Sequence, residues 1–516
     1  MTPAGQSTSG HDQEAVLAFL SNHEPQCKRV DTHASIVFLG KDRVLKVKRA
    51  VCLPFLDYST LEKRKQACEE ELIVNRRFAP KLYRRVVPVT QGRGGFEIDG
   101  KGPVIEWAVE MSRFDESKTF DHLARAGLIG PELADALAAR LREAHRQAEI
   151  SDGSSWLASI PGIIERNSQV FLDEAELPRE TVQRLDALSQ QRLRDCRELL
   201  QTRASKGLIR RCHGDAHLGN IVLIDGKPVL FDAIEFDPVI ATTDVLYDLA
   251  FPVMDFCHFR LKACANRLFN GYLQSSWPDN GTALRLLPLF LSMRAAIRAD
   301  VLFTKRRLTR DRDHDPNDAR GYFDLALRFI EPARPSLIAI GGKSGTGKSV
   351  LAREIAALPP PLPGAVLLRS DVIRKELFGM EPLAALPEAA YAPEVTVRVY
   401  RTLLERSRQI IDQGLSVVVD AAFLKQSERN ELSKAAAAID AEFRPVFLTA
   451  DLAVRLDRIR SRKNDASDAT AEIAAGQEDY DIGEIAWPII DASGSPEQTL
   501  ERARPVLVRD DQCCKT

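Results

Sequence analysis

A glycine-rich segment in the second half of the chain constrains the fold more than any other feature of the sequence. Residues 342–349 read GKSGTGKS, an apolar run at 336–340 precedes them, and a helical pattern follows at 350–357. The order of strand, glycine-rich loop and helix is the P-loop (Walker A) arrangement, in which backbone N–H groups at a helix N-terminus approach phosphate. The residues expected to bind ATP phosphates or their Mg²⁺ are Gly342, Gly345, Thr346, Gly347, Lys348 and Ser349, with Ser349 as the metal ligand.

A second apolar run, residues 416–419, ends at Asp420. Such a strand followed by a carboxylate is typical of the Walker B motif, whose aspartate polarises the water shell of Mg²⁺. Together the two motifs predict an α/β P-loop NTPase domain with a mostly parallel sheet over residues 335–508. The sequence EPARP at 331–335 breaks the preceding helical pattern and marks the domain boundary.

Candidate acceptor and lid residues lie between and beyond these motifs. Residues 367–371, with Asp371 and the nearby Arg374, resemble the acceptor-binding strand end of P-loop small-molecule kinases, a group that includes gluconate and polynucleotide kinases. Arg429 and an arginine cluster resemble the lid that neutralises transferring phosphate. The cluster consists of Arg455, Arg458, Arg460 and Arg462, of which we take Arg460 and Arg462 as candidates. A solvated helix in which Asp457 pairs with Arg460 explains the cluster equally well.

Residues 213–237, HGDAHLGNIVLIDGKPVLFDAIEFD, indicate a second phosphate-transfer site. Asp215 and Asn220 have the D-x-x-x-x-N spacing of a kinase catalytic loop, in which the aspartate takes the acceptor hydroxyl proton and the asparagine holds Mg²⁺. Asp232 ends the next apolar run and is the candidate for a second metal ligand. One amide oxygen and one carboxylate suit Mg²⁺, which keeps water and is completed by substrate phosphates.

The dipeptide Asp225-Gly226 lies between the two apolar runs and predicts a tight hairpin. If Ile224 pairs with Val229, Asn220 comes within one residue of facing Asp232, so the two metal-seeking side chains meet. The alternative is an ordinary surface hairpin, in which these residues only form turns and caps.

Three segments together resemble the aminoglycoside phosphotransferase family, a branch of the protein-kinase-like fold: HGDAHLGN at 213–220, Phe231-Asp232, and DVLYDLA at 244–250. The resemblance implies an α+β bilobal domain with Asp215 as general base and with Asn220 and Asp232 as Mg²⁺ ligands. It also implies that Asp244 and Asp248 brace the catalytic loop from behind and that His213 is a structural residue.

Lys46 interrupts an apolar strand at 44–47 and resembles the kinase lysine that pairs with ATP phosphates. Lys48 shares its face and could substitute, and both could instead be solvated lysines on an edge strand. A kinase-like site needs a helix glutamate to hold the lysine. Glu71 fits because Val74 and Phe78 follow at +3 and +7, although a solvated acidic face remains an alternative.

Two further expectations concern nucleotide binding in the first half. By resemblance only, Glu110 and Met111 lie at the hinge that contacts adenine through backbone groups. No G-x-G-x-x-G occurs between residues 32 and 47, so the means of clamping ATP phosphates is open.

The chain from residue 120 onward is mostly helical by pattern, with a loop expected around Trp156–Gly162. Between residues 258 and 328 there are 13 Lys or Arg against 7 Asp, including Arg294, Arg298, Lys305, Arg306 and Arg307. A polycationic aminoglycoside would prefer an acidic pocket, so this balance favours a neutral or anionic acceptor. Solvated helix faces account for the same arginines at least as well.

The 516 residues exceed what a single hydrophobic core supports, and the net charge of -2 favours neither nucleic acid nor an anionic membrane as a partner. Nine cysteines without metal spacing, no positive signal region and no membrane-length apolar run predict a cytoplasmic, soluble protein. The expected organisation is a disordered lead-in at 1–14, the kinase-like domain at 15–333, the P-loop domain at 335–508 and a tail at 509–516.

These features predict an ATP- and Mg²⁺-dependent phosphotransferase that acts on a small-molecule hydroxyl and carries a second, P-loop ATP site. Two alternatives stay open. One is a nucleotide-sensing regulatory ATPase whose kinase-like half binds a ligand without turnover, and the other is an antibiotic-resistance kinase.

Overall fold

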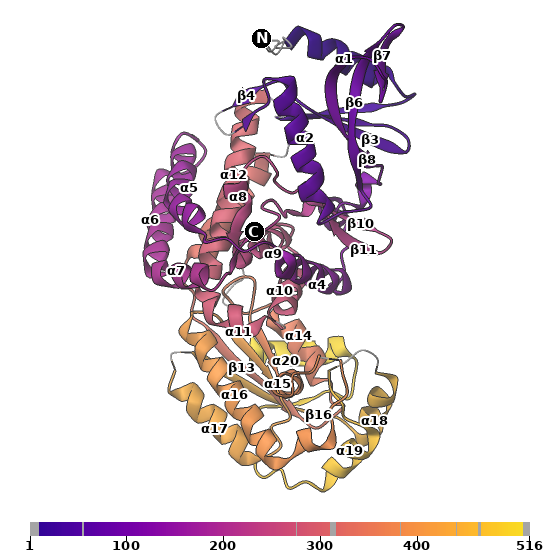
Figure 1. The fold of residues 1–516 in the computed structure, drawn as a ribbon. Coiled ribbons are helices and arrows are strands. Elements are labelled where there is room, and N and C mark those ends of the chain that lie inside the picture. The colour runs from indigo at the N-terminus through magenta and orange to yellow at the C-terminus, as the bar shows by residue number, and fades with distance from the viewer. Residues whose placement is uncertain are drawn as a thin grey trace. The chain divides into compact units, whose positions relative to one another are not determined.

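The computed structural model describes residues 10–32, 34–53, 56–274, 276–309, 316–381, 383–439, 441–462 and 466–508 (Figure 1). By contact density the chain divides into two compact units. The first consists of Met1–Ile129, Ala139–Ile160 and Leu200–Pro252, and the second of Gly130–Ala138, Pro161–Leu199 and Val253–Thr516. Four helices contribute residues to both units: α4 (Pro131–Gln147), α5 (Ser154–Leu172), α7 (Arg197–Ser205) and α9 (Val245–His258).

The first unit contains a six-stranded antiparallel sheet in the order β1-β2-β3-β8-β6-β7. Its strands are β1 (Lys28–Asp31), β2 (Ser35–Leu39), β3 (Arg43–Lys48), β6 (Tyr83–Gly92), β7 (Gly95–Ile98) and β8 (Val104–Ser112). Helix α1 (Gly10–Asn22) packs on one face, where Leu45 and Val47 are buried, and α2 (Leu61–Arg76) packs on the other, where Val44 is buried. Because side chains alternate along a strand, Lys46 and Lys48 share the α2 face with Val44.

Helix α1 begins at Gly10, inside the segment predicted as a disordered lead-in, whereas residues 1–9 lie outside the described part of the chain. Val16, Leu17 and Leu20 pack against the sheet, and this apolar face stabilises the helix. A two-stranded ribbon of β4 (Cys52–Leu53) and β5 (Leu56–Asp57) precedes α2.

The predicted catalytic hairpin consists of β10 (Ile221–Ile224) and β11 (Lys227–Leu230). Its register corrects the expected one, because Ile224 pairs with Lys227 rather than with Val229. Asp225 and Gly226 both have positive φ, 51° and 72°, which is the two-residue turn that this dipeptide favours. The shift is two residues, so every side chain keeps its predicted face, and Asp232 still lies within one residue of the position opposite Asn220.

Short elements surround this hairpin in the first unit. Strands β9 (Ile209–Arg211) and β12 (Thr242–Asp244) pair antiparallel immediately before and after the catalytic segment. The remaining elements are η1 (Glu116–Lys118), α3 (Phe120–Arg125), η2 (Leu218–Asn220) and α8 (Pro238–Ala241). The loop expected around residues 156–162 is wrong, since α5 runs through it with Pro161 inside the helix. Trp156, Ile160 and Ile164 are buried at four-residue spacing, so the apolar face of the helix outweighs the proline.

The second unit combines helices with a five-stranded parallel sheet in the order β14-β15-β13-β16-β17. The strands are β13 (Ser336–Gly342), β14 (Val366–Arg369), β15 (Val417–Asp420), β16 (Glu442–Thr449) and β17 (Ile489–Asp491). All four strand pairs are parallel, which confirms the predicted P-loop type of fold. The core of this sheet is apolar, with Ile338, Val418 and Val446 buried against helices α14 (Lys348–Ala356) and α20 (Pro496–Leu507).

The other helices of the second unit fall into two groups along the chain. Before the sheet come α6 (Arg179–Asp195), α10 (Lys262–Leu273), α11 (Trp277–Asn280), η3 (Gly281–Leu286), α12 (Leu287–Thr309) and α13 (Pro316–Ile330). Within the sheet region come α15 (Ser370–Leu377), η4 (Glu388–Tyr391), α16 (Pro393–Asp412), α17 (Gln426–Ala437), α18 (Leu452–Ser461), α19 (Ala471–Gly476) and η5 (Gln477–Asp479). Among the described helices, none combines the length and the apolar character needed to cross a membrane.

Two asparagines of α10 cap the edge strand β14. Asn266 Nδ2 donates to the carbonyl of Ala365 at 3.0 Å, and Asn270 Oδ1 accepts from the N–H of Leu367 at 2.7 Å. Backbone groups of an edge strand otherwise seek another strand or water. The helix thus covers the strand that leads directly to Arg369 and Asp371.

Candidate active sites

The first candidate site forms where β3, α2 and the segment after β11 meet. Lys46 Nζ lies 2.8 Å from Glu71 Oε1 and 2.5 Å from Asp232 Oδ1. Burial lowers the pKa of Lys46, but the adjoining Asp232 and Glu71 carboxylates outweigh it and hold the pKa above its ordinary value. The structure therefore brings the predicted lysine, helix glutamate and metal ligand together as a charged group.

The two lysines of β3 have different partners. Lys48 Nζ lies 2.7 Å from the other oxygen of Glu71 and also contacts Glu235, and its side chain is only 1% exposed. Lys46 instead contacts Asp232. Of the two lysines, Lys46 is therefore the one that contacts a predicted metal ligand, as expected of the predicted phosphate-binding lysine. Neither lysine is a solvated residue of an edge strand.

Asp232 occupies a specialised backbone position. Its φ is 58°, in the left-handed region that costs energy for a residue other than glycine. Its N–H donates to Tyr83 Oη at 3.1 Å, and the next residue, Ala233, is hydrogen-bonded to Asn75 of α2. Burial raises the pKa of Asp232, yet the charge of Lys46 outweighs it and lowers the pKa, so the carboxylate stays ionised.

Asp215 and Asn220 are in direct contact. Asn220 Nδ2 donates to the Asp215 carbonyl and to Asp215 Oδ2, both at 3.0 Å. The amide nitrogen is thus used within the loop, which leaves the amide oxygen as the acceptor for a metal. The Asp215 side chain is 37% exposed, as an aspartate that receives a proton from a substrate must be accessible.

The catalytic loop is held from behind by Asp248. Its Oδ1 accepts from the Gly214 N–H at 2.8 Å, and its Oδ2 lies 3.0 Å from His145 Nε2. Asp244 behaves differently, since it pairs with the buried Arg203 at 2.5 Å and caps α9 through the Leu246 N–H. Of the two predicted braces, Asp248 therefore contacts the loop and Asp244 fixes the helix that carries Asp248.

His213 has the structural role expected of it. Its ring is buried, with Nε2 2.9 Å from the Phe231 carbonyl and Nδ1 accepting from the Asp215 N–H at 3.4 Å. Burial lowers the pKa of His213 below its ordinary value despite the nearby Asp248 and Asp215 carboxylates. The neutral imidazole therefore links the predicted catalytic loop to the segment between β11 and Asp232.

The lowered pKa of His213 predicts a loss of stability in acid. As the pH falls below 6.5, the unfolded chain takes up a proton on this histidine before the folded chain does, so the free energy of unfolding decreases. Replacing His213 with glutamine, whose amide can still donate to Phe231, should make this decrease smaller. Urea denaturation of both proteins at several pH values measures it, and identical slopes below pH 6.5 would contradict the prediction.

Glu110 and Met111 do not offer free backbone groups in this structure. Strand β8 pairs with β3 at Leu45 and Val44 and with β6 at Arg85 and Tyr83 across these same two residues. The Glu110 carboxylate binds Arg85 at 3.1 Å. Their adenine-binding role therefore stays a prediction.

The second candidate site is the P-loop between β13 and α14. Gly342, Gly345 and Gly347 have φ values of 140°, 83° and 92°, a conformation that side chains rarely adopt. A Cβ on Gly345 would also lie 2.6 Å from the Arg455 carbonyl. Both observations explain why glycine occupies these positions.

The polar residues of the two Walker motifs meet at one point. Ser349 Oγ donates to Asp420 Oδ2 at 2.6 Å, and Lys348 Nζ donates to the Lys343 carbonyl across the loop at 3.0 Å. A hydroxyl and a carboxylate are hard oxygen donors that suit Mg²⁺. Asp232 with the Asn220 amide oxygen at the first site forms a similar oxygen donor set, so the residues at both sites fit the metal.

Arg369 is a residue that the sequence reasoning did not single out. It is opposite Asp420 in the strand register, its Nε donates to Asp420 Oδ2 at 3.1 Å, and its Nη2 donates to Ser349 Oγ at 2.9 Å. Asp371 lies near the same group, and burial together with the Asp420 charge raises its pKa. The signal in the sequence was only that Arg369 ends the strand before Asp371.

The candidate arginines of the second half have structural contacts that correct part of the prediction. Arg429 is 2% exposed and donates to the carbonyls of Phe423, Leu424, Ile482 and Glu484, so it fastens two loops together rather than serving a lid. Arg374 is also buried and donates to the Ala390 carbonyl at 2.7 Å. Arg374 thus fixes the segment around Ala390, a structural contact that argues against its predicted role in binding substrate.

Within the arginine cluster, the residues that touch the P-loop are not the two chosen from the sequence. Arg455 Nε donates to the Ser344 carbonyl at 2.8 Å, and Arg458 Nη1 donates to the Thr346 carbonyl at 3.4 Å. Arg460 is exposed, and Arg462 donates to the Ala469 carbonyl at 2.9 Å. The three-residue spacing from 455 to 458 places both contacts on one face of α18, which the sequence pattern alone left undecided.

Comparison with known proteins agrees with this division of sites. Residues 31–287 match the model of the phosphotransferase enzyme family, and residues 337–480 match the model of an AAA domain. The chain joins a phosphotransferase-family domain to an AAA domain. A curated protein of Mycobacterium tuberculosis, described as uncharacterized, is 27% identical over 493 residues, which cover 93% of this chain and 95% of that protein.

Solved structures similar to parts of the chain include two kinases. A gluconokinase from Sinorhizobium meliloti 1021 is 23% identical and covers 34% of this chain and 91% of its own, with a TM-score of 0.25. A choline/ethanolamine kinase family protein from Mesorhizobium loti is 13% identical and covers 62% of this chain and 95% of its own, with a TM-score of 0.38.

The basic helical region that follows the phosphotransferase motifs contains two kinds of arginine. Arg306 pairs with Glu174 and Glu176 at 3.1 Å each, as in a solvated helix face. Arg294 of α12 is only 4% exposed, and the Arg298 guanidinium lies 5.7 Å from the Tyr322 ring. The solvated-face explanation thus holds for Arg306 and not for Arg294.

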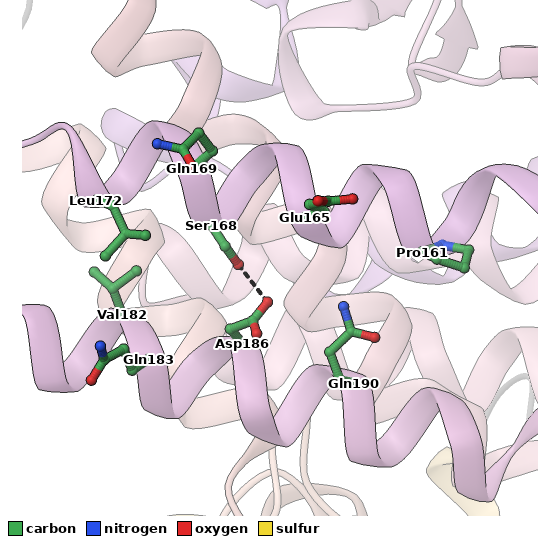
Figure 2. Close-up of a pocket in the computed structure, with 9 residues that line it drawn as sticks. All are labelled: Pro161, Glu165, Ser168, Gln169, Leu172, Val182, Gln183, Asp186 and Gln190. Carbon is green, nitrogen blue, oxygen red and sulfur yellow. Dashed lines mark hydrogen bonds between the residues drawn. The ribbon is translucent and has the colours of Figure 1, made fainter.

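A groove of about 430 Å³ lies between α5 and α6 (Figure 2). Its lining residues are Pro161, Glu165, Ser168, Gln169, Leu172, Val182, Gln183, Asp186 and Gln190. Ser168 Oγ donates to Asp186 Oδ1 at 2.7 Å across it. None of the predicted site residues lines this groove, so it is separate from both sets of motif residues.

Proposed function

We propose that the chain is an ATP- and Mg²⁺-dependent phosphotransferase that acts on a hydroxyl group of a small molecule. The observation that carries this proposal is the contact of Lys46 with both Glu71 and Asp232, at 2.8 and 2.5 Å. A fixed ammonium group beside a metal-binding carboxylate is the arrangement that holds the phosphates of ATP. The hydrogen-bonded pair of Asp215 and Asn220 supplies the base and the second oxygen ligand.

In the proposed reaction, Asp215 accepts the proton of the acceptor hydroxyl while the hydroxyl oxygen forms a bond to the γ-phosphorus. The bond between that phosphorus and the β,γ-bridging oxygen breaks, and ADP leaves. Lys46 keeps the phosphates in position, and Glu71 keeps Lys46 in position. Mg²⁺, held by Asn220 and Asp232, would supply charge neutralisation on the phosphates.

We further propose that the AAA domain is a second ATP-dependent kinase site. In this proposal, Lys348 binds the phosphates of ATP, Ser349 binds Mg²⁺, and Asp371 contacts the acceptor. Its raised pKa supports a role in proton transfer, because a base works best when its pKa approaches the working pH.

The acceptor of the first site is, in this proposal, neutral or anionic. The excess of 13 Lys or Arg over 7 Asp between residues 258 and 328 supports this choice, since like charges would lower the affinity for a polycation. Strong, saturable phosphorylation of kanamycin-type aminoglycosides at micromolar concentration would overturn this choice of acceptor and favour a resistance kinase.

The experiment that tests the proposal measures ADP release from ATP and Mg²⁺ against a library of hydroxyl-bearing metabolites. Separate Asp215→Ala and Lys348→Ala variants assign each acceptor-dependent activity to one site. The proposal predicts that Asp215→Ala removes turnover of one set of acceptors and leaves any activity of the AAA domain. If neither substitution changes acceptor-dependent turnover, the two-kinase interpretation fails and a sensing role gains support.

A further inference from the structure

Lys48, the second lysine of β3, contacts two acidic residues and is absent from the proposed reaction. Its Nζ lies 2.7 Å from Glu71 Oε2 and also contacts Glu235. Lys46 uses the other oxygen, Glu71 Oε1, at 2.8 Å. Each oxygen of the Glu71 carboxylate therefore has its own lysine, and the orientation of the carboxylate is fixed from both sides.

Glu235 belongs to the segment that carries the predicted metal ligand Asp232. Between them, the Ala233 N–H donates to Asn75 Oδ1 at 2.7 Å, and Asn75 Nδ2 donates to the Ala233 carbonyl at 3.3 Å. Glu71 and Asn75 are one turn apart on α2, so they share a face of the helix. The helix therefore contacts residues 232–235 at three points: directly through Asn75, through Lys46 at Asp232 and through Lys48 at Glu235.

The charges and burial of this group show how tightly it is built. Glu71 and Asn75 are 0% exposed, and Lys48 is 1% exposed. Two lysines face the three carboxylates of Glu71, Asp232 and Glu235, which leaves one negative charge in excess. Removing one charged partner from such a buried group is strongly unfavourable. A cation beside Asp232 would balance the excess negative charge.

We propose that Lys48 is a positioning residue that keeps α2 and the metal-binding segment assembled whether or not nucleotide is bound. It acts through Glu71, because a carboxylate held by Lys48 keeps Lys46 at a fixed position between Glu71 and Asp232. Without Lys48, Glu71 contacts Lys46 alone and α2 loses one of its three attachments to residues 232–235. This inference rests on the proposed function of the first site, where Lys46 and Asp232 bind ATP and Mg²⁺.

The test compares amide hydrogen–deuterium exchange of the full chain with and without Mg²⁺ and a non-hydrolysable ATP analogue. In the parent, peptides of α2 should exchange equally slowly in both conditions. The charge-balanced variant Lys48→Met/Glu235→Gln loses the contacts of Lys48 with Glu71 and Glu235. Without nucleotide, it should therefore raise amide exchange in α2 about tenfold. Nucleotide should restore much of the protection. Its KM for ATP should rise while the KM for the acceptor stays unchanged, a split that a general loss of stability would not produce.

Two further variants keep the test decisive. Asn75→Ala removes only the direct attachment and should also speed exchange in α2, so it tests the assembly if the double variant does not fold. Lys375→Met/Asp468→Asn removes a buried lysine–aspartate pair of the AAA domain, 3.2 Å apart, and should leave α2 exchange unchanged. The conservative variant Lys48→Arg keeps the positive charge, so α2 should exchange as slowly in it as in the parent.

Two results would overturn the inference: unchanged α2 exchange in Lys48→Met/Glu235→Gln, or strong slowing of α2 exchange in the parent when nucleotide is added. Failure of the proposed function gives a different result. In that case an Asp232→Asn variant binds Mg²⁺ and the analogue as the parent does, while the nucleotide-free comparison still decides the role of Lys48.

Discussion

Replacing Asp215 with asparagine should lower kcat for acceptor phosphorylation by about 10²- to 10⁴-fold, the usual contribution of a general base. The KM for ATP should change little, because Lys46, Asn220 and Asp232 remain in place. An asparagine side chain can still accept the hydrogen bond that Asn220 Nδ2 donates to Asp215 Oδ2 at 3.0 Å, so the loop should keep its conformation. The substitution therefore removes the proton acceptor and little else.

A matched control exists in the same hairpin. Asp225 lies at the tip with a φ of 51°, a conformation that asparagine tolerates well. The Asp225→Asn variant makes the same chemical change about ten residues away and should retain kcat. Steady-state kinetics with an acceptor found in the library screen measure both variants. A fall in kcat of less than about threefold for Asp215→Asn, or equal losses in both variants, would contradict its role as base.

Replacing Lys348 with alanine should abolish measurable nucleotide binding at the AAA domain. In the structure the ammonium group donates to the Lys343 carbonyl across the loop, and burial with the neighbouring Arg455 and Arg369 charges lowers its pKa despite the Asp420 and Asp371 carboxylates. Each lost hydrogen bond between charged groups costs about 1.5–3 kcal/mol, so affinity should fall at least about tenfold. Calorimetric titration with an ATP analogue should then give one binding site per chain where the parent gives two.

Lys343, in the same loop, provides the control. It is partly exposed and pairs with Glu478 at 3.0 Å at the rim of the site. Such partly exposed ion pairs contribute little, so Lys343→Ala should leave two binding sites per chain. If Lys348→Ala keeps both sites, the P-loop does not bind nucleotide through this lysine, and the assignment of the second site fails.

Local sequence patterns were enough to predict the fold class of the second part, whereas that of the first part came from the resemblance to the aminoglycoside phosphotransferase family. A glycine-rich loop between a strand and a helix specifies its own geometry, and the parallel sheet around it followed. In the first part, the spacing of Asp215 and Asn220 and the tight Asp225-Gly226 turn gave the hairpin. The register was two residues off because the expected pairing of Ile224 with Val229 left residues 225–228 in the loop, whereas Asp225 and Gly226 alone form the turn.

Contacts between distant segments were beyond the reach of these patterns. Periodicity placed Glu71 on the inner face of its helix, but it could not show that both β3 lysines would share this carboxylate. An arginine that binds phosphate and one that binds four carbonyls, as Arg429 does, have the same local sequence signal. The role of Arg369 depends on the pairing of β14 with β15, which joins residues 51 positions apart.

The asparagine contacts between α10 and β14 determine where a fragment that contains the parallel sheet can begin. A fragment that begins at the predicted boundary, Pro335, would lack Asn266 and Asn270 and expose the Ala365 carbonyl and the Leu367 N–H on an edge strand. Such an edge can recruit the same strand of another molecule, so the fragment should self-associate. A fragment that begins before Lys262 keeps both asparagines and should remain monomeric. Helix α10 thus protects the edge of the parallel sheet that follows it in the chain.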